Sequence, residues 1–312
     1  MGNVKIFFAT DLHGSEKCFK KFINASKVYK ADVMIIGGDL TGKALIPFVV
    51  KRDGSITVDY FGQKLFINSE GQEHKHINEA SDYGYYPYKI SEEAYNDFMH
   101  DERAISVAFL NMMKERLKGW IKLVESELRG MTVIINAGND DPFELDSVLD
   151  SSPAIIHPEG RVIEVNGYEV ISTGYTNMTP WHAPRDIPEE ALRDKIDFMA
   201  SNLRNPKKSI FNIHPPPFNS GLDMAPKIDK QLRPVAPGMQ MEAVGSKAVR
   251  EMIEKYQPLL GLHGHVHESR AAKMINSTLA INPGSDYQYG ILRGALVEIG
   301  NGKVINYMLT TW

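Results

Sequence analysis

Three histidines occupy alternate positions in the segment GLHGHVH, residues 261–267. They are His263, His265 and His267, and an apolar run comes directly before them. Side chains two residues apart in an extended segment point the same way, so these imidazoles can converge on one point. Because imidazole is a common ligand of transition metals, such a point is where a metal ion would sit.

Metal-capable side chains also follow four other apolar runs. The runs lie at Val4–Ala9, Val33–Ile36, Val133–Ile135 and Ile210–Ile213, and the side chains after them are Asp11 with His13, Asp39, Asn139 and His214. In an open α/β sheet, ligands bind at the carboxyl ends of the strands. A single loop histidine or aspartate is usually a cap, a turn residue or a solvated charge. That explanation does not account well for five such positions.

The elements that must position these residues begin with a strand, a helix and a strand. Val4–Ala9 and Val33–Ile36 are expected strands, and Glu16–Tyr29 between them has the pattern of an amphipathic helix. This order predicts parallel strands joined by a right-handed crossover. Two hairpins are predicted later, joining 161–165 to 168–172 and 295–299 to 304–309.

Residues 43–130 have a different pattern. Short strands are expected at 56–58 and 64–67, an irregular Tyr-rich stretch at 68–90, and a helix from a Ser91 cap to about Leu128. We interpret 43–130 as an insertion within a single domain of residues 1–312. It could partly cover a site, or be a peripheral extension or an oligomer contact, and the last two together are favoured over a working lid.

Composition limits the class of protein. The chain has 312 residues, 43% of them apolar, which is enough for one domain with a substantial core. Its net charge of −4 provides no general attraction to long nucleic acids. The single cysteine, Cys18, cannot form an internal disulfide. No apolar run approaches the ~20 residues of a membrane span, and the N-terminal segment lacks a signal-peptide pattern. We expect a cytoplasmic protein without a membrane partner; its oligomeric state stays open.

Six motifs occur in a fixed order along the chain. They are DLH at 11–13, GGD at 37–39, GND at 138–140, IHPPP at 213–217, GHVH at 264–267 and NPGS at 282–285. This ordered set resembles the signature of the calcineurin-like metallophosphoesterase superfamily, and the resemblance covers the core but leaves out 43–130. It implies the α/β class, as a four-layer α/β/β/α sandwich with βαβ units and an insertion after the second strand.

The resemblance also implies a dinuclear metal site. One ion would be held by Asp11, His13 and His267, the other by Asn139, His214 and His265, and Asp39 would bridge them. Mixed carboxylate, imidazole and amide ligands suit Mn²⁺, Fe or Zn²⁺ better than Mg²⁺ or Ca²⁺. Two divalent ions outweigh two carboxylates, so the site attracts a phosphoryl group, and the Asn139 amide serves the ion and the substrate without cancelling charge. A hydroxide bridging the ions is the expected nucleophile.

The segment GNDD, residues 138–141, departs from the family. Many members carry, at the position of Asp140, a histidine that assists phosphate binding or leaving-group protonation. A carboxylate there would repel phosphate unless it is protonated or paired. Members with other residues at this position tend towards phosphodiesters. Asp140 and Asp141 are the candidate catalytic residues; Asp141 could instead orient a ligand or cap a helix beginning at 142–143, and the cap is favoured.

Three further segments contain residues that could bind a ligand but that also have ordinary structural explanations. His182 and Arg185, in TPWHAPRD, are candidate substrate-binding residues, although such loops are also plain connections. His263 is outside the family's ligand set and is expected to be a hydrogen-bonded core histidine. GGDLTGK at 37–43 begins like a phosphate-binding P-loop, but Ala44 and Pro47 argue against that motif.

The expected function is metal-dependent hydrolysis of a small phosphate ester, with a phosphodiester mildly preferred over a phosphomonoester. One alternative is a nuclease acting on short nucleic acids, because the acidic balance and the lack of a basic cluster count against long ones. The other is a non-catalytic scaffold that binds proteins. Scaffolds of this kind usually lose metal ligands, whereas all seven positions are filled here.

Overall fold

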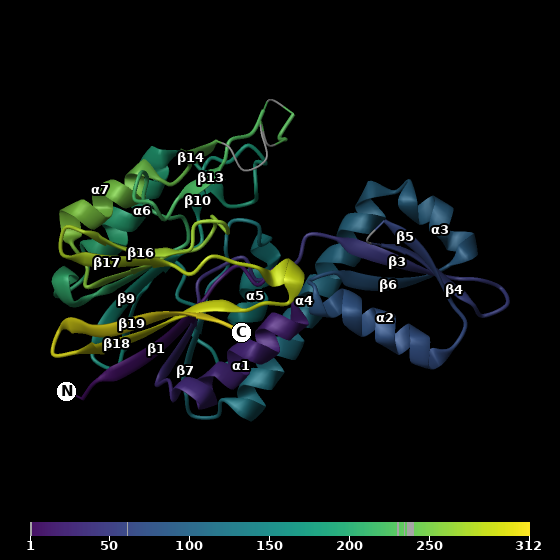
Figure 1. Cartoon of the computed structure of the whole chain (residues 1–312), viewed down its shortest axis with the longest axis horizontal. Helices are drawn as coiled ribbons and strands as arrows, with labels where there is room; N and C mark the ends of the chain where they lie inside the picture. Colours follow the sequence, from purple (N-terminus) through teal and green to yellow (C-terminus); the bar gives the residue numbers. More distant parts are fainter. Residues whose placement is uncertain (1, 61, 230, 234, 236–239) are drawn as a thin grey trace.

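The computed structural model describes residues 2–60, 62–229, 231–233, 235 and 240–312, and two large sheets form its centre (Figure 1). The five-stranded sheet has the order β19-β18-β1-β2-β7, and the six-stranded sheet has the order β16-β17-β15-β12-β9-β8. The first contains β1 (Val4–Ala9), β2 (Val33–Ile36), β7 (Thr132–Ile135), β18 (Arg293–Gly300) and β19 (Lys303–Thr311). The second contains β8 (Val162–Val165), β9 (Tyr168–Thr173), β12 (Ile210–Ile213), β15 (Leu260–Leu262), β16 (Ala271–Ile275) and β17 (Thr278–Asn282).

Alternation along β1 shows how the five-stranded sheet is packed. Phe7 belongs to an apolar cluster with the helices α1 (Glu16–Tyr29) and α4 (Glu102–Glu127), whereas Phe8 belongs to a cluster shared with the six-stranded sheet. A third cluster joins the other face of the six-stranded sheet to α6 (Glu189–Ala200) and α7 (Lys247–Tyr256). The mixed α/β class predicted from the sequence is confirmed.

The strands that precede the candidate ligands run in parallel. β1 pairs with β2 and β2 with β7, all parallel, and β12 pairs in parallel with both β9 and β15. The carboxyl ends of parallel strands meet at the same edge of their sheet. The predicted strand–helix–strand start is confirmed. The Ser15 hydroxyl, which was not predicted as a cap, accepts from the Cys18 N–H at the start of α1.

Both predicted hairpins are present. β8 and β9 pair antiparallel, as do β18 and β19. Their turns contain Asn166-Gly167 and Asn301-Gly302, and all four residues have φ between 49° and 84°. Positive φ at both central residues matches the right-handed twist of paired strands, and Asn-Gly adopts it readily.

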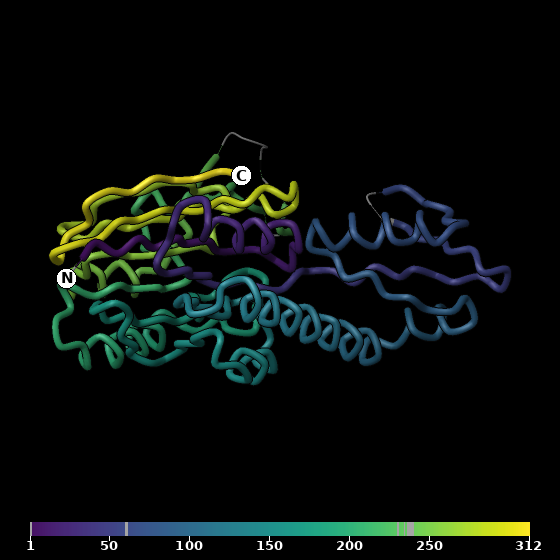
Figure 2. The backbone as a smooth tube through the Cα atoms, turned by 90° about the horizontal axis from the view of Figure 1, so that it is seen from below, coloured from purple at the N-terminus to yellow at the C-terminus, as the bar shows by residue number. Residues whose placement is uncertain are grey.

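Residues 45–99 form a smaller unit beside the two large sheets (Figure 2). Its sheet has the order β5-β4-β3-β6, and its elements are β3 (Leu45–Val50), β4 (Ile56–Tyr60), β5 (Gln63–Ile67), α2 (Glu70–Asp82), β6 (Tyr86–Ser91) and α3 (Glu92–Met99). The irregular stretch predicted at 68–90 is wrong, since it contains α2 and β6. Within α2, Ala80 is the one residue that is fully buried, so the helix has no apolar stripe for a sequence pattern to reveal.

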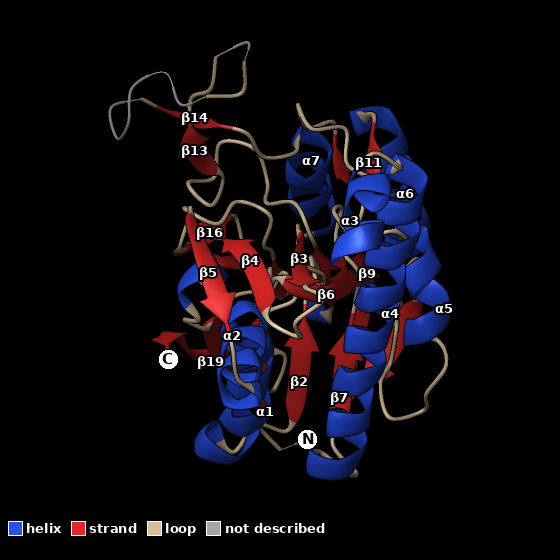
Figure 3. Ribbon diagram, turned by 90° about the vertical axis from the view of Figure 1, so that its right-hand side faces the viewer, coloured by secondary structure: helices blue, strands red, loops and turns tan. Residues whose placement is uncertain are grey.

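The helix predicted from Ser91 to about Leu128 is two helices. The Ser91 hydroxyl accepts from the Ala94 N–H and caps α3, and the Asp101 carboxylate accepts from the Ala104 N–H and caps α4. The second half of α4 lies in the main core, where the Trp120 ring stacks on Phe19 with the centroids 4.2 Å apart. The long course of α4 past β7 is visible in Figure 3. α4 therefore packs partly against the small unit and partly against the five-stranded sheet.

The remaining elements are short. They are η1 (Phe143–Leu145), α5 (Asp146–Leu149), β10 (Thr176–Asn177), β11 (Asp186–Ile187), η2 (Pro206–Lys208), β13 (Met224–Pro226), β14 (Met241–Ala243) and η3 (Tyr287–Tyr289). Among the described residues, none of the helices combines the length and the apolar character that a bilayer crossing requires.

Candidate metal centre

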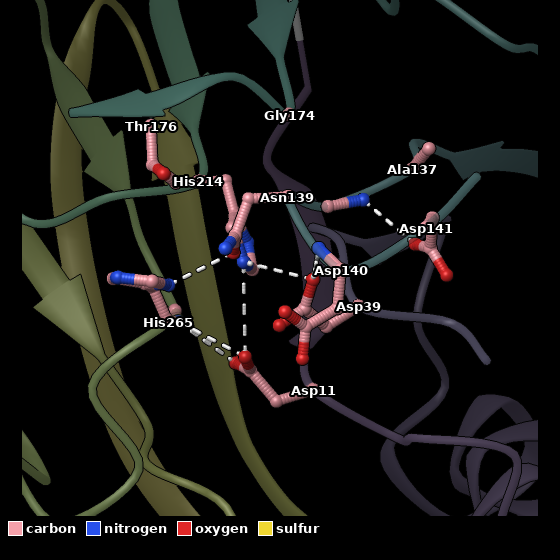
Figure 4. A network of polar contacts seen from close by, with 12 residues as sticks. Asp11, Asp39, Ala137, Asn139, Asp140, Asp141, Gly174, Thr176, His214 and His265 are labelled. Atoms are coloured by element: carbon pink, nitrogen blue, oxygen red, sulfur yellow. Dashed lines mark hydrogen bonds and ion pairs between the residues drawn. The ribbon is translucent and has the colours of Figure 1, made fainter. Parts of the chain in front are cut away.

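The seven predicted ligand side chains lie together at the carboxyl ends of the strands. Two groups of donor atoms form, each with all its atoms within 4.8 Å of one another, and Asp39 belongs to both. The first group is Asp11, His13, Asp39 and His267, and the second is Asp39, His214 and His265. Asn139 joins the second group, because its Oδ1 lies 2.9 Å from Nδ1 of His265. Figure 4 shows Asp11, Asp39, Asn139, His214 and His265 pointing towards one another.

Four of these residues have left-handed backbone conformations. The φ angles are 54° at Asp11, 41° at His13, 48° at Asp39 and 66° at His265. This conformation is uncommon outside glycine and costs of order 1–3 kcal/mol per residue, so it persists only where the surroundings enforce it. Hydrogen bonds between the first two loops do so: the N–H of Asp11 donates to Gly38 O and the N–H of His13 to Asp39 O.

Two glycines allow the loops to approach closely. A Cβ at Gly138 would lie 2.1 Å from Asp39 Oδ1, and a Cβ at Gly264 would lie 2.3 Å from Asp11 Oδ2. Both distances are far below van der Waals contact, so any other residue would push the carboxylates away. The lack of space for a Cβ thus explains why the GND and GHVH motifs have glycine at these two positions.

The first group has closely spaced nitrogen and oxygen donors. Nε2 of His13 lies 3.1 Å from Nε2 of His267 and 3.6 Å from Oδ2 of Asp39, and Nε2 of His267 lies 3.4 Å from Oδ1 of Asp11. Burial lowers the pKa of His13 to about 3, against the attraction of Asp39. This imidazole is therefore neutral at physiological pH, which is the form that binds a metal.

His214 is the central histidine of the second group. Its Nε2 lies 3.4 Å from Asp39 Oδ1 and 3.8 Å from Asp11 Oδ1, and both ring nitrogens are buried without a hydrogen-bond partner. Burial alone would lower the pKa of His214, but Asp39 and then Asp11 outweigh it and raise the pKa to about 9. The two carboxylates thus create a potential at this point that favours positive charge.

Asp140 lies beside the centre and is paired. Its main-chain N–H donates to Asp39 Oδ1 at 3.1 Å, and its Oδ2 lies 2.9 Å from Nζ of Lys43. Burial, followed by the charge of Asp39, raises the pKa of Asp140. Lys43 ends the GGDLTGK segment, where no helix follows and β3 begins at Leu45, so the P-loop interpretation is excluded. Sequence reasoning missed Lys43, because nothing in its spacing indicates the pairing with Asp140.

Asp141 has a different place from the one predicted. It is fully buried, and its carboxylate accepts from the main-chain N–H groups of Leu40, Thr41 and Gly138 and from the Thr41 hydroxyl. The favoured helix cap is wrong, since η1 has no side-chain cap. Burial, with Asp39 next, raises the pKa of Asp141 to about 6. Asp141 holds the loop of Asp39, a positioning role that the sequence analysis had ranked second.

Arg185 is fully buried, contrary to its predicted contact with substrate. Its guanidinium pairs with Asp146, donates to the carbonyl oxygens of Asp141 and Pro142 and lies over the Phe143 ring. Its main-chain N–H donates to Asn139 O. It therefore supports the Asn139 loop from behind. His182 is exposed on the same connection, and its contact with substrate stays a prediction.

Two supporting residues were not singled out from the sequence. Asp186 accepts from Asn139 Nδ2 at 3.2 Å and from the Thr176 hydroxyl at 3.0 Å, so the amide oxygen of Asn139 faces His265. Asn282, the first residue of NPGS, donates to the carbonyl oxygens of Gly264 and Val266 and so holds the histidine loop. Both roles depend on contacts between distant segments, which the local sequence does not indicate.

His263 is outside both donor groups, as expected. It is buried, and its Nδ1 lies 2.8 Å from Ile213 O and 3.1 Å from Pro215 O. These contacts tie the histidine loop to the end of β12. The interpretation as a hydrogen-bonded core histidine is confirmed.

Comparison with known proteins finds a sequence match over about half of the chain and solved structures with a similar fold over its whole length. No family model matches the chain. An uncharacterized protein, MJ1162 of Methanocaldococcus jannaschii, is 30% identical over 156 residues, which are 49% of this chain and 64% of that protein. A solved structure aligns over 99% of both chains with a TM-score of 0.58 and 16% identity. TT1561 of Thermus thermophilus aligns over 100% of this chain and 99% of its own, with a TM-score of 0.51 and 15% identity.

At these identities the solved structures show a shared fold. The carboxylate and histidine side chains of the motifs form the two metal-capable groups.

Proposed function

We propose that this chain is a metallophosphoesterase that hydrolyses small phosphate esters at a centre of two divalent metal ions. The observation that carries the proposal is the pair of donor groups that share one carboxylate, Asp39. Phosphodiesters are the mildly preferred substrates, on the ground that Asp140 stands where many members of the superfamily that the motifs resemble carry a histidine. The three core clusters support the four-layer α/β/β/α arrangement that this family has.

The donor set fits divalent transition metals. The carboxylate of Asp39 belongs to both donor groups, and Asn139 adds a neutral amide oxygen. His214 is the most specific indicator, because its buried ring nitrogens make no hydrogen bond and Nε2 faces the carboxylates of Asp39 and Asp11, an arrangement that a bound cation would satisfy. Carboxylate and imidazole donors together favour Mn²⁺, Fe or Zn²⁺.

The chemistry divides between the ions and the chain. When bound, two divalent ions lower the pKa of water and stabilise charge on phosphoryl oxygens. The chain's part is to hold the donors rigidly, through the four left-handed residues and through Asp141, which fixes the loop of Asp39. With Asp186 orienting its side chain, Asn139 presents an uncharged donor that does not repel an anionic substrate.

The region 43–130 is proposed to be an insertion in a single domain. Its small sheet pairs only within itself among the described strands, which supports the proposal. The loop between α2 and β6 approaches the metal centre: a Cβ at Gly84 would lie 2.3 Å from His13 O. The insertion therefore contacts the loop that carries His13.

The test combines metal content with turnover. The chain is loaded with Mn²⁺ and assayed on bis-p-nitrophenyl phosphate and on p-nitrophenyl phosphate, and bound manganese is counted by mass spectrometry. We expect about two ions per chain and loss of at least 100-fold of the activity in Asp39→Asn, because one shared ligand serves both ions. Asp194→Asn, which changes an exposed carboxylate of α6, is the matched control.

A non-catalytic scaffold would hydrolyse neither nitrophenyl ester, and neither Mn²⁺ nor Asp39→Asn would change that result. A nuclease would prefer short oligonucleotides over both nitrophenyl esters. Either result would replace the proposed function.

A further inference from the structure

Lys43 is the partner of Asp140 beside the metal centre. Its side chain is 55% exposed, and Nζ lies 2.9 Å from Oδ2 of Asp140. Asp140 itself is joined to the shared ligand, since its main-chain N–H donates to Asp39 Oδ1. The charge of Lys43 also acts on His13 and His267. The ammonium group thus lies beside Asp140, which contacts the shared ligand Asp39, and it belongs to neither donor group.

The backbone before Lys43 is held in place. The N–H of Thr41 donates to Asp141, and the N–H of Gly42 donates to the Tyr86 hydroxyl at 3.2 Å. A Cβ at Gly42 would lie 1.9 Å from Gly84 O, so this turn is packed against the small unit. A long side chain therefore extends from a fixed base to Asp140.

The charges around the centre raise a problem that Lys43 can solve. A phosphate ester is an anion, and Asp140 places a carboxylate where many members of the superfamily that the motifs resemble have a histidine. An unpaired carboxylate there would oppose binding. Lys43 cancels that charge, and its ammonium group has three donors, so it can bind a second oxygen while it stays near Asp140.

We propose that Lys43 binds a phosphoryl oxygen of the substrate, and that it also neutralises Asp140 so that this carboxylate does not repel the anion. The proposal rests on the proposed function and adds the anion-binding side chain that the metal ligands do not provide. An ordinary surface ion pair is the competing explanation, and pairs of that kind contribute little to stability. The two explanations differ in what each partner does to phosphate affinity.

The experiment measures binding of inorganic phosphate to the Mn²⁺-loaded chain by equilibrium dialysis with radiolabelled phosphate. The variants are Lys43→Met, Lys43→Arg, Asp140→Asn and the double variant of Lys43→Met with Asp140→Asn. Lys207→Met, at an exposed lysine of η2, is the matched control. Manganese content and thermal midpoint are measured for each variant, so that loss of the fold or of the ions is recognised.

The expected results have opposite signs for the two partners. Lys43→Met weakens phosphate binding about tenfold or more, the size of one charge-assisted hydrogen bond. Asp140→Asn binds phosphate at least as tightly as the wild type, because a repelling charge is removed. The double variant lies between them, and Lys43→Arg keeps most of the affinity. In turnover, Lys43→Met raises KM more than it lowers kcat.

Unchanged phosphate binding in Lys43→Met, or weaker binding in Asp140→Asn, overturns the inference. Either result can occur while the wild type hydrolyses esters with Mn²⁺, and then the proposed function stands. If the wild type binds Mn²⁺ but hydrolyses no ester, the proposed function fails separately.

Discussion

Individual residues of this chain are held in costly states at one place. Left-handed backbone, buried carboxylates and an unpartnered imidazole all occur within the loops that carry Asp11, Asp39, His214 and His265. Each of these features opposes folding when considered alone. Their concentration at the carboxyl ends of the strands indicates that the loops are adapted to bind something.

Asp141 is the residue whose role is most specific at this scale. Its two oxygens accept four hydrogen bonds from the loops of Leu40 and Gly138. In Asp141→Asn, an amide group replaces one oxygen and faces main-chain N–H groups that then lack an acceptor. We expect a loss of about 2–4 kcal/mol in the free energy of unfolding, from one or two unsatisfied buried donors. Urea denaturation measures it.

Asp140→Asn is the neighbouring control for this stability measurement. Asp140 is partly exposed and pairs with a half-exposed lysine, so the same substitution should cost less than about 1 kcal/mol. Equal losses in the two variants would contradict the role assigned to Asp141.

Elements of the fold differ in how well the sequence predicts them. The boundaries of β1, α1 and β2 follow directly from apolar runs and periodicity, because these elements are buried against the core. β3 and β6 escaped prediction since they pair in parallel across about 40 residues of chain. The elements that carry the ligands were predictable, whereas those of the small unit needed tertiary context.

The residues of the site also divide into those that the sequence predicts and those that depend on tertiary context. Asp11, Asp39 and His214 could be identified because each follows an apolar run that becomes a buried strand. Lys43 and Arg185 could not be assigned correctly, because an ion pair or a buried position depends on which distant segments meet.

α4 connects the small unit to the core, and Trp120 is one of its buried core residues. The indole is buried, stacks on Phe19 at an interplanar angle of 3° and donates from Nε1 to Glu16. Trp120→Ala should reduce the free energy of unfolding by about 3–5 kcal/mol, because a large cavity remains in the core. Chemical denaturation monitored by circular dichroism gives the value.

Trp181→Ala makes the same chemical change at a side chain that is 63% exposed, and should cost less than about 1 kcal/mol. If Trp120→Ala unfolded no more easily than Trp181→Ala, the core position of the second half of α4 would be in error.

The molecule as a whole joins two sheets whose strand ends supply one centre. The five-stranded sheet carries Asp11 and Asp39 at its strand ends, and the six-stranded sheet carries His214 and His265. The donor groups therefore form only when the two sheets pack together through their shared apolar cluster. Any ligand that binds both groups must stabilise this packing, because the unfolded chain separates the donors.

Manganese should therefore raise the unfolding temperature of the whole chain. A ligand that binds only the folded state adds about 2.7 kcal/mol at a concentration 100-fold above its Kd, which corresponds to a shift of several degrees for a chain of this size. Differential scanning calorimetry of the chain stripped with EDTA, with and without Mn²⁺, measures the shift. Asp39→Asn should lose most of the increase, since Asp39 is the one described carboxylate common to both donor groups. Asp194→Asn should keep all of it. If Mn²⁺ raised the unfolding temperature of Asp39→Asn as much as that of the wild type, Mn²⁺ would stabilise the fold from another site. The proposal that a ligand of both donor groups holds the two sheets together would then be wrong.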